Sequence, residues 1–94
     1  MNRSTFMSSL DAGAPPEDSG SALTALWLEK RGDWDAAHDS VKASTPDNCW
    51  VHAYLHRREG DASNAAYWYR RAAKPVCDAS LDDEWASLVD ALTA

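Results

Sequence analysis

The residues of this chain that could carry out chemistry lie in one stretch, residues 38–56. Cys49, His52 and His56 are spaced so that they would share one face of a helix. A thiolate and imidazole nitrogens are ligands that zinc and other borderline metals accept, and His38 could add a fourth ligand from a preceding helix. The same thiol and imidazoles could instead act as a nucleophile and its base.

Both chemical interpretations compete with an ordinary one, in which Cys49 is a buried thiol and the two histidines lie on a partly solvated helix face. Structural zinc sites usually take paired Cys or His ligands from separate short loops, which this spacing does not provide. For a thiol enzyme, neither an oxyanion donor nor a third, orienting group can be placed from the sequence. The sequence therefore favours the ordinary interpretation, with no metal ligands, no cofactor and no enzymatic activity.

The composition is that of a folded, acidic protein of one domain. The 94 residues are 45% hydrophobic and include five Trp, three Tyr and one Phe, far more aromatic residues than a disordered segment carries. Fifteen acidic against nine basic residues give a net charge of −6, which repels a polyanion. We therefore expect no nucleic-acid partner.

No stretch of the sequence predicts a membrane segment or a secretion signal. A bilayer span needs about 18 consecutive apolar residues, and the first 20 residues lack the apolar core of a signal peptide. Because disulfides are rare in proteins without a secretion signal, Cys49 and Cys77 are expected to be reduced. The expected location is the cytoplasm, with no contact to a membrane.

The elements that must position these residues begin after an N-terminal tail and linker over residues 1–20. Residues 11–21 are rich in Ala, Gly, Pro and Ser and have no apolar period. Before them, Phe6, Met7 and Leu10 form the apolar edge of a helical turn that is too short to be stable alone. This tail either packs on a surface or is mobile.

Capping residues and glycine stops predict five helices within residues 21–94. The helices are expected over residues 22–31, 34–43, 46–59, 62–74 and 81–94, with Ser21, Asp33, Thr45, Asp61 and Ser80 as the respective caps. A Gly-Asp pair separates the first helix from the second and the third from the fourth. No segment alternates as a strand would.

The two Gly-Asp corners belong to a repeat. Shifting the chain by 28 residues pairs Gly32-Asp33 with Gly60-Asp61 and Ala37 with Ala65, without a gap. Each helix pair would leave one apolar face open, and stacking a second pair against it covers that face. The predicted fold is therefore all-α, with two stacked antiparallel helical hairpins closed by a C-terminal capping helix.

The second unit, AYLHRREGDASNAAYWYRRAAKP, resembles a tetratricopeptide repeat, and its AAYWYRRAA segment is also similar to a Sel1-like repeat. The resemblance covers residues 21–75 as one good and one eroded repeat, with a period of 28 residues where the family has about 34. It implies a short tetratricopeptide-like domain over residues 21–94, in which the first helix of each pair lines a concave groove.

The groove implied by this resemblance would show Leu26 from the first unit and Trp50 and Tyr54 from the second. Groove types that clamp a terminal carboxylate use Lys and Asn, so an aromatic groove suits an apolar or aromatic-rich segment better. We therefore predict a non-catalytic protein–protein interaction module that binds a peptide or protein segment. Its binding residues would be Leu26, Trp50, Tyr54, Arg57 and Arg58, with the aromatic pair as anchors and the arginines as rim charges.

The aromatic residues also leave an alternative open. Trp27 and Trp85 lie on apolar stripes and are predicted to be in the core. The others, Trp50, Tyr54, Tyr67 and Trp68, exceed what so few helices can bury. The remaining aromatic surface, or the edge formed by Phe6, Met7 and Leu10, could instead bury against a second copy of the chain in a two-fold homodimer.

Charge is unevenly distributed along the chain. The second unit is basic, with Arg57, Arg58, Arg70, Arg71 and Lys74, and the last segment is acidic, with Asp78, Asp82, Asp83, Glu84 and Asp90. The basic residues could receive an acidic peptide, or, as the second interpretation, the two regions could attract each other or simply solvate their helix faces. Exposed charge pairs contribute only about 0–1 kcal/mol and are common without a function, so the second interpretation is favoured.

Overall fold

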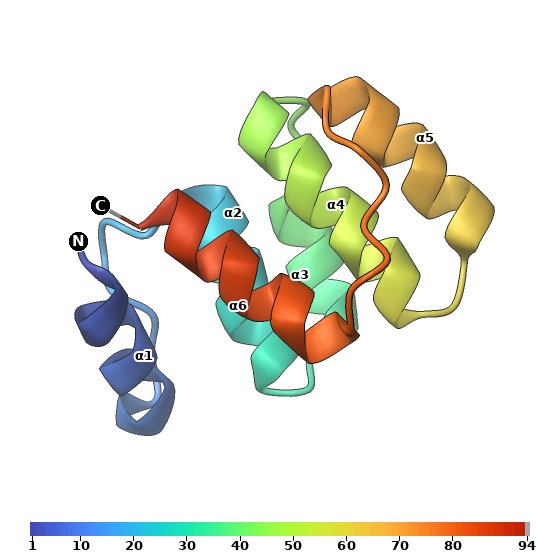
Figure 1. Ribbon diagram of the computed structural model, residues 1–94. Coiled ribbons are helices and arrows are strands. Elements are labelled where there is room, and N and C mark those ends of the chain that lie inside the picture. Colours follow the sequence, from blue (N-terminus) through green and yellow to red (C-terminus); the bar gives the residue numbers. More distant parts are fainter. Residues whose placement is uncertain (94) are drawn as a thin grey trace.

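The computed structural model describes residues 1–93 and is all-α, which confirms the predicted fold class. Its helices are α1 Arg3–Ala12, α2 Gly20–Lys30, α3 Trp34–Ser40, α4 Pro46–Arg58, α5 Ala62–Ala72 and α6 Leu81–Leu92 (Figure 1). No strand occurs within the described residues. The last residue of the predicted fifth helix, Ala94, lies outside them.

The two Gly-Asp corners form as predicted. Gly32 and Gly60 have φ angles of 90° and 84°, the left-handed region that glycine enters without steric penalty. The carboxylates of Asp33 and Asp61 then accept hydrogen bonds from backbone amides three residues further on, at 3.1 and 3.2 Å. Each corner thus ends one helix and begins the next within a few residues.

Other helix ends agree with the prediction in part. Thr45 caps α4, with Pro46 in its first position, and Ser80 caps α6. By contrast, α2 begins at Gly20, and Ser21 donates to Asn48 Oδ1 at 2.8 Å instead of capping. α3 ends at Ser40, shorter than the expected helix to residue 43.

Packing joins α2 to α3 and α4 to α5, and α6 lies across α2 and α4 (Figure 1). Trp27 and Trp85 are 5% and 3% exposed, which confirms that both belong to the core. Small residues, Ala53 and Ala65, lie in the contact between α4 and α5, where they let the two helices approach closely. The stacking of these pairs as repeat units stays a prediction.

Within the predicted N-terminal tail, residues 3–12 form helix α1 and pack against α2 and α6. Phe6 is fully buried, with its ring centroid 6.3 Å from that of Trp85. Trp27 Nε1 donates to Ser9 Oγ at 3.1 Å, and an Arg31 nitrogen donates to the Leu10 carbonyl at 2.6 Å. The apolar edge identified in the sequence therefore has a surface of its own chain to cover.

None of the helices in the described part of the chain combines the length and the apolar character needed to cross a bilayer.

Candidate functional site

The face predicted to be an open groove is covered by α6. Leu26 and Tyr54 are fully buried and Trp50 is half-buried, while the Arg57 and Arg58 side chains are 18% and 30% exposed. Leu26 and Tyr54 are therefore core residues, and the prediction that they are exposed to a partner is wrong. A closing helix was predicted from the sequence, but not its position over these residues.

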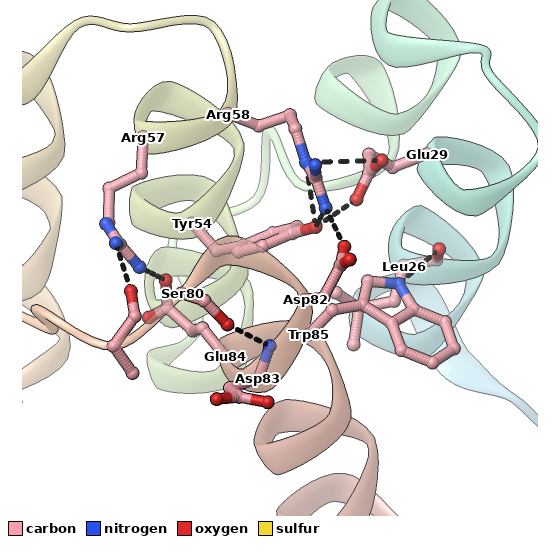
Figure 2. A network of polar contacts seen from close by, with 11 residues as sticks. Leu26, Glu29, Tyr54, Arg57, Arg58, Ser80, Asp82, Asp83, Glu84 and Trp85 are labelled. Carbon is pink, nitrogen blue, oxygen red and sulfur yellow. Dashed lines mark hydrogen bonds and ion pairs between the residues drawn. The ribbon is translucent and has the colours of Figure 1, made fainter.

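Arg57 joins α4 to α6 through a buried carboxylate. It donates to Glu84 Oε1 at 2.5 Å and to the Ala79 carbonyl at 2.6 Å (Figure 2). The second Glu84 oxygen accepts a hydrogen bond from the Tyr69 hydroxyl. Burial and this bond raise the pKa of Tyr69, so its hydroxyl stays protonated and acts as a donor near neutral pH.

Arg58 makes a second connection between α4 and its neighbours. Its guanidinium donates to the Tyr54 hydroxyl at 2.8 Å, and it lies 3.2 Å from Asp82 in α6 and 3.6 Å from Glu29 in α2 (Figure 2). The Tyr54 hydroxyl in turn donates to Glu29. Burial and the bond to Glu29 raise the pKa of Tyr54 above its usual value.

These two networks show what two of the basic residues of the second unit do. Arg57 and Arg58 pair with Glu84 and Asp82 of the acidic segment, so attraction between the two regions is confirmed for them. The other basic residues of the second unit, Arg70, Arg71 and Lys74, are absent from the ion pairs of the described residues. Their charge remains available.

An apolar pocket of about 220 Å³ lies beside the covered face. Its lining residues come from α4, the segment after α5, and α6: Trp50, Lys74, Pro75, Val76, Cys77, Glu84, Ser87 and Leu88. Lys74 Nζ lies 4.2 Å from the Trp50 ring centroid, within cation–π range, and Val76 is 61% exposed. Of the predicted binding residues, Trp50 is the one that lines this pocket.

The three histidines of the chain come together between α3 and α4. The His52 ring centroid lies 4.6 Å from that of His38 and 4.9 Å from that of His56, and His38 and His56 are 5.4 Å apart. His52 and His56 are each only 5% exposed, so the expectation that they lie on a partly solvated face is wrong. Cys49 is buried and lies outside both clusters of potential metal ligands among the described residues. These clusters are His38, His52 and His56, and His56, Glu59 and Asp61.

Two tryptophans flank this histidine cluster. Trp34 stacks on His38, with ring centroids 4.9 Å apart, and Trp68 stacks on His52 at 3.8 Å. Trp34 is fixed in turn by a 2.8 Å hydrogen bond from its indole nitrogen to the Leu55 carbonyl. The imidazoles are therefore held in place by aromatic packing from both helix pairs.

The surroundings of His52 favour its neutral form. Burial, and to a smaller extent the neighbouring His38 and His56, lower the pKa of His52 to about 4. His52 Nδ1 is buried and has no hydrogen-bond partner among the described residues, which is unusual for a polar atom in a protein interior. His56 Nδ1 lies 2.6 Å from Glu59 Oε1, which can accept its proton in a hydrogen bond.

All three histidines were candidates from the sequence, two of them on one helix face and His38 as a further ligand from the preceding helix. His52 and His56 are four residues apart, a spacing that stacks two side chains on one helix face. Cys49, three residues before His52, was predicted to be the third member on that face. The third imidazole instead comes from His38 in α3, which only the packing of α3 on α4 could decide.

Comparison of this chain with protein-family models, curated proteins and solved structures gave no match in any of the three. The function is therefore argued from the geometry alone.

Proposed function

We propose that this protein is a non-catalytic interaction module that binds a segment of another protein at the pocket beside Trp50. The observation that carries the proposal is the pocket itself, an apolar hollow that combines a half-buried indole, an exposed valine and a lysine. Half-buried aromatic residues in apolar pockets are the usual anchors of protein interfaces. In this proposal α2–α3 and α4–α5 are the two units of a short tetratricopeptide-like domain.

The chemistry of the pocket defines its ligand. Its wall is mainly apolar, so it suits one aliphatic or aromatic side chain of the partner. Lys74 lies at this wall, and no carboxylate of residues 1–93 is within ion-pair distance of it, although the protein as a whole carries a charge of −6. An acidic residue next to the apolar one would pair with it, so we infer an acidic and apolar peptide segment as the partner.

The remaining predicted binding residues take an indirect role in this proposal. Arg57 holds Glu84 and Arg58 holds Asp82, and Leu26 and Tyr54 lie beneath α6. Since α6 supplies Glu84, Ser87 and Leu88 to the pocket, these contacts support the pocket wall without touching a ligand. Trp50, Lys74 and Val76 are the residues expected to touch the partner.

A peptide library tests this proposal. Peptides are selected on the full-length chain, and the dissociation constant of a selected peptide is measured by fluorescence anisotropy for Lys74→Glu, Val76→Asp and a control, Arg70→Glu. The control makes the same charge change at an exposed position that does not line the pocket. For the first two variants we expect the dissociation constant to rise about tenfold or more, which is a loss of about 1.4 kcal/mol in binding free energy. The control should change it little.

The result can also contradict the proposal. If all three variants bind the selected peptides as the unmodified chain does, the pocket is not the binding site. If the Arg70→Glu variant loses as much affinity as the Lys74→Glu variant, the binding depends on general charge instead of on this pocket. Circular dichroism of each variant confirms that the fold is retained.

A further inference from the structure

We propose that His38, His52 and His56 form a binding site for one divalent transition-metal ion of borderline softness, with Zn²⁺ as the leading candidate and three imidazole nitrogens as ligands. The site shares no residue with the pocket beside Trp50, so it stands or falls independently of the proposed interaction function. It would be placed by the contact between α3 and α4.

The first argument is geometric. One ring nitrogen from each of the three histidines lies within 4.8 Å of the others. Zinc–nitrogen bonds of about 2.0–2.1 Å place two ligand nitrogens of a tetrahedral site roughly 3.3 Å apart. The ligand nitrogens must therefore approach one another by at most about 1.5 Å, and His38, half-buried in the last turn of α3, is the least enclosed of the three residues. His52 and His56 already have the i, i+4 spacing that binds zinc on one helix face.

The second argument is the unpaired nitrogen of His52. A buried polar atom without a partner destabilises the folded state, because it has lost its hydrogen bonds to water. A bound cation would give a function to an arrangement that is unfavourable for three packed imidazoles alone.

The third argument is the partner of His56. With Glu59 accepting the proton on Nδ1, the lone pair of this ring is on Nε2, and the carboxylate fixes the orientation of the ring. A carboxylate that accepts from the second nitrogen of a ligand histidine is the common outer partner of zinc sites. Glu59 and Asp61 also form a group with His56 whose ligand atoms lie within 4.8 Å of one another. The negative charges of Glu59 and Asp61 offset the positive charge of Arg71, whose guanidinium lies over the Trp68 ring, 5.0 Å from its centroid.

The chemical class of the ion follows from the donor set. Three imidazoles without a thiolate suit Zn²⁺, Co²⁺, Ni²⁺ and Cu²⁺, whereas Mg²⁺ and Ca²⁺ prefer oxygen ligands. Trp34 and Trp68 cover the cluster with ring faces that carry no ligand atoms. The proposal therefore predicts selection of the borderline metals over Mg²⁺ and Ca²⁺.

The test uses the metal-free full-length chain and the metals alone. Zn²⁺ binding is measured by calorimetry, and Co²⁺ is used as a spectroscopic probe because its visible absorption reports the ligand set. We expect one equivalent of either metal to bind, and no binding of Mg²⁺. His38→Ala removes a ligand from a half-buried position and should weaken binding by more than Glu59→Gln, which we expect to weaken it by about 10- to 100-fold.

Cys77→Ser is the matched control, because a partly exposed thiol is the competing soft ligand, and it should leave the affinity unchanged. Long-range ¹H–¹⁵N spectra of the unmodified chain give a result that needs no variant, since its three histidines are the three proposed ligands. Zn²⁺ should shift the imidazole nitrogens of all three. Absence of metal uptake, shifts in fewer than three imidazoles, or equal affinity of the unmodified chain and His38→Ala would overturn the proposal.

Discussion

Glu84 illustrates how single side chains fix α6 on the rest of the molecule. It is 4% exposed, yet it is a carboxylate with two hydrogen-bond partners, Arg57 and Tyr69, on α4 and α5. A charge in this position is tolerated only because it is paired and hydrogen-bonded. In the sequence, Asp82, Asp83 and Glu84 are equivalent acids in the first turn of a helix. Only the packing of α6 distinguishes the one that is buried, so its role could not be predicted.

Replacing Arg57 should therefore destabilise the protein strongly. Arg57→Ala leaves the buried Glu84 carboxylate without its cation, and we expect a loss of about 2–4 kcal/mol in the free energy of unfolding. Urea unfolding followed by circular dichroism measures it. Lys42→Ala is the control, because its pair with Asp39 is largely exposed and contributes about 0–1 kcal/mol. Equal stabilities of the two variants would show that the Arg57–Glu84 pair has no special weight.

His52 predicts a dependence of stability on acid. Its pKa is about 4 in the folded chain and about 6.5 when exposed, so between these pH values the unfolded chain binds a proton that the folded chain does not. Stability of the metal-free protein should therefore fall as the pH drops from about 6.5 to 4, by roughly 3 kcal/mol in total from this residue.

The measurement is urea unfolding in the presence of a chelator at a series of pH values. The interval from pH 6.5 to 5 is the diagnostic one, because most carboxylates begin to titrate only below it. His52→Gln should show a smaller slope in this interval than the unmodified chain. A stability that does not change there would contradict a neutral, buried His52.

Helix ends show which features of an element are local. Both Gly-Asp corners, the Thr45-Pro46 start and the Ser80 cap were predictable, because each depends on a few consecutive residues. The start of α2 was not, since Ser21 is drawn to Asn48, 27 residues away in sequence. Likewise, α1 looked too short to be stable because the surface that stabilises it is formed by α2 and α6.

The backbone at two helix ends gives a paired prediction. Gly60 has a φ of 84°, and an added Cβ would meet nothing within 4 Å, so Gly60→Ala should lower stability only through its backbone, by about 0.5–1 kcal/mol after the smaller entropy of the unfolded alanine is subtracted. Ala73 ends α5 with a φ of 57° although it is not glycine. Ala73→Gly relieves that strain and should raise stability by about 0.5–1 kcal/mol after the greater entropy of an unfolded glycine is subtracted.

Thermal and urea unfolding of both variants check this pair. The two changes are opposite in chemistry and opposite in expected sign, so each serves as the control of the other. If Ala73→Gly is destabilising, the left-handed conformation at residue 73 is not the one that this helix end adopts in solution.

For the whole molecule, the features that could be predicted from the sequence are those that do not depend on how distant helices pack on one another. The helical class, the core tryptophans and the close approach of α4 and α5 follow from composition, apolar stripes and small residues. The prediction that Leu26 and Tyr54 line an open groove was wrong, because the sequence cannot distinguish apolar residues that contact a partner from apolar residues that contact α6. His38 could be named as a possible ligand from the sequence, but that it takes the place of Cys49 in the cluster depends on how α3 packs on α4.

The N-terminal helix gives the prediction that concerns the molecule as a whole. If residues 1–20 are a free tail, Phe6→Ala should change stability by no more than about 0.5 kcal/mol, as for an exposed position. Because Phe6 is fully buried beside Trp85, we expect a loss of about 3–5 kcal/mol.

Sedimentation then addresses self-association. Deleting residues 1–18 would uncover Trp27 and Trp85, and such an apolar patch favours dimers, so the shortened chain should associate more than the full chain. The opposite pattern, a full-length dimer that dissociates on deletion, would instead support a homodimer formed through Phe6, Met7 and Leu10.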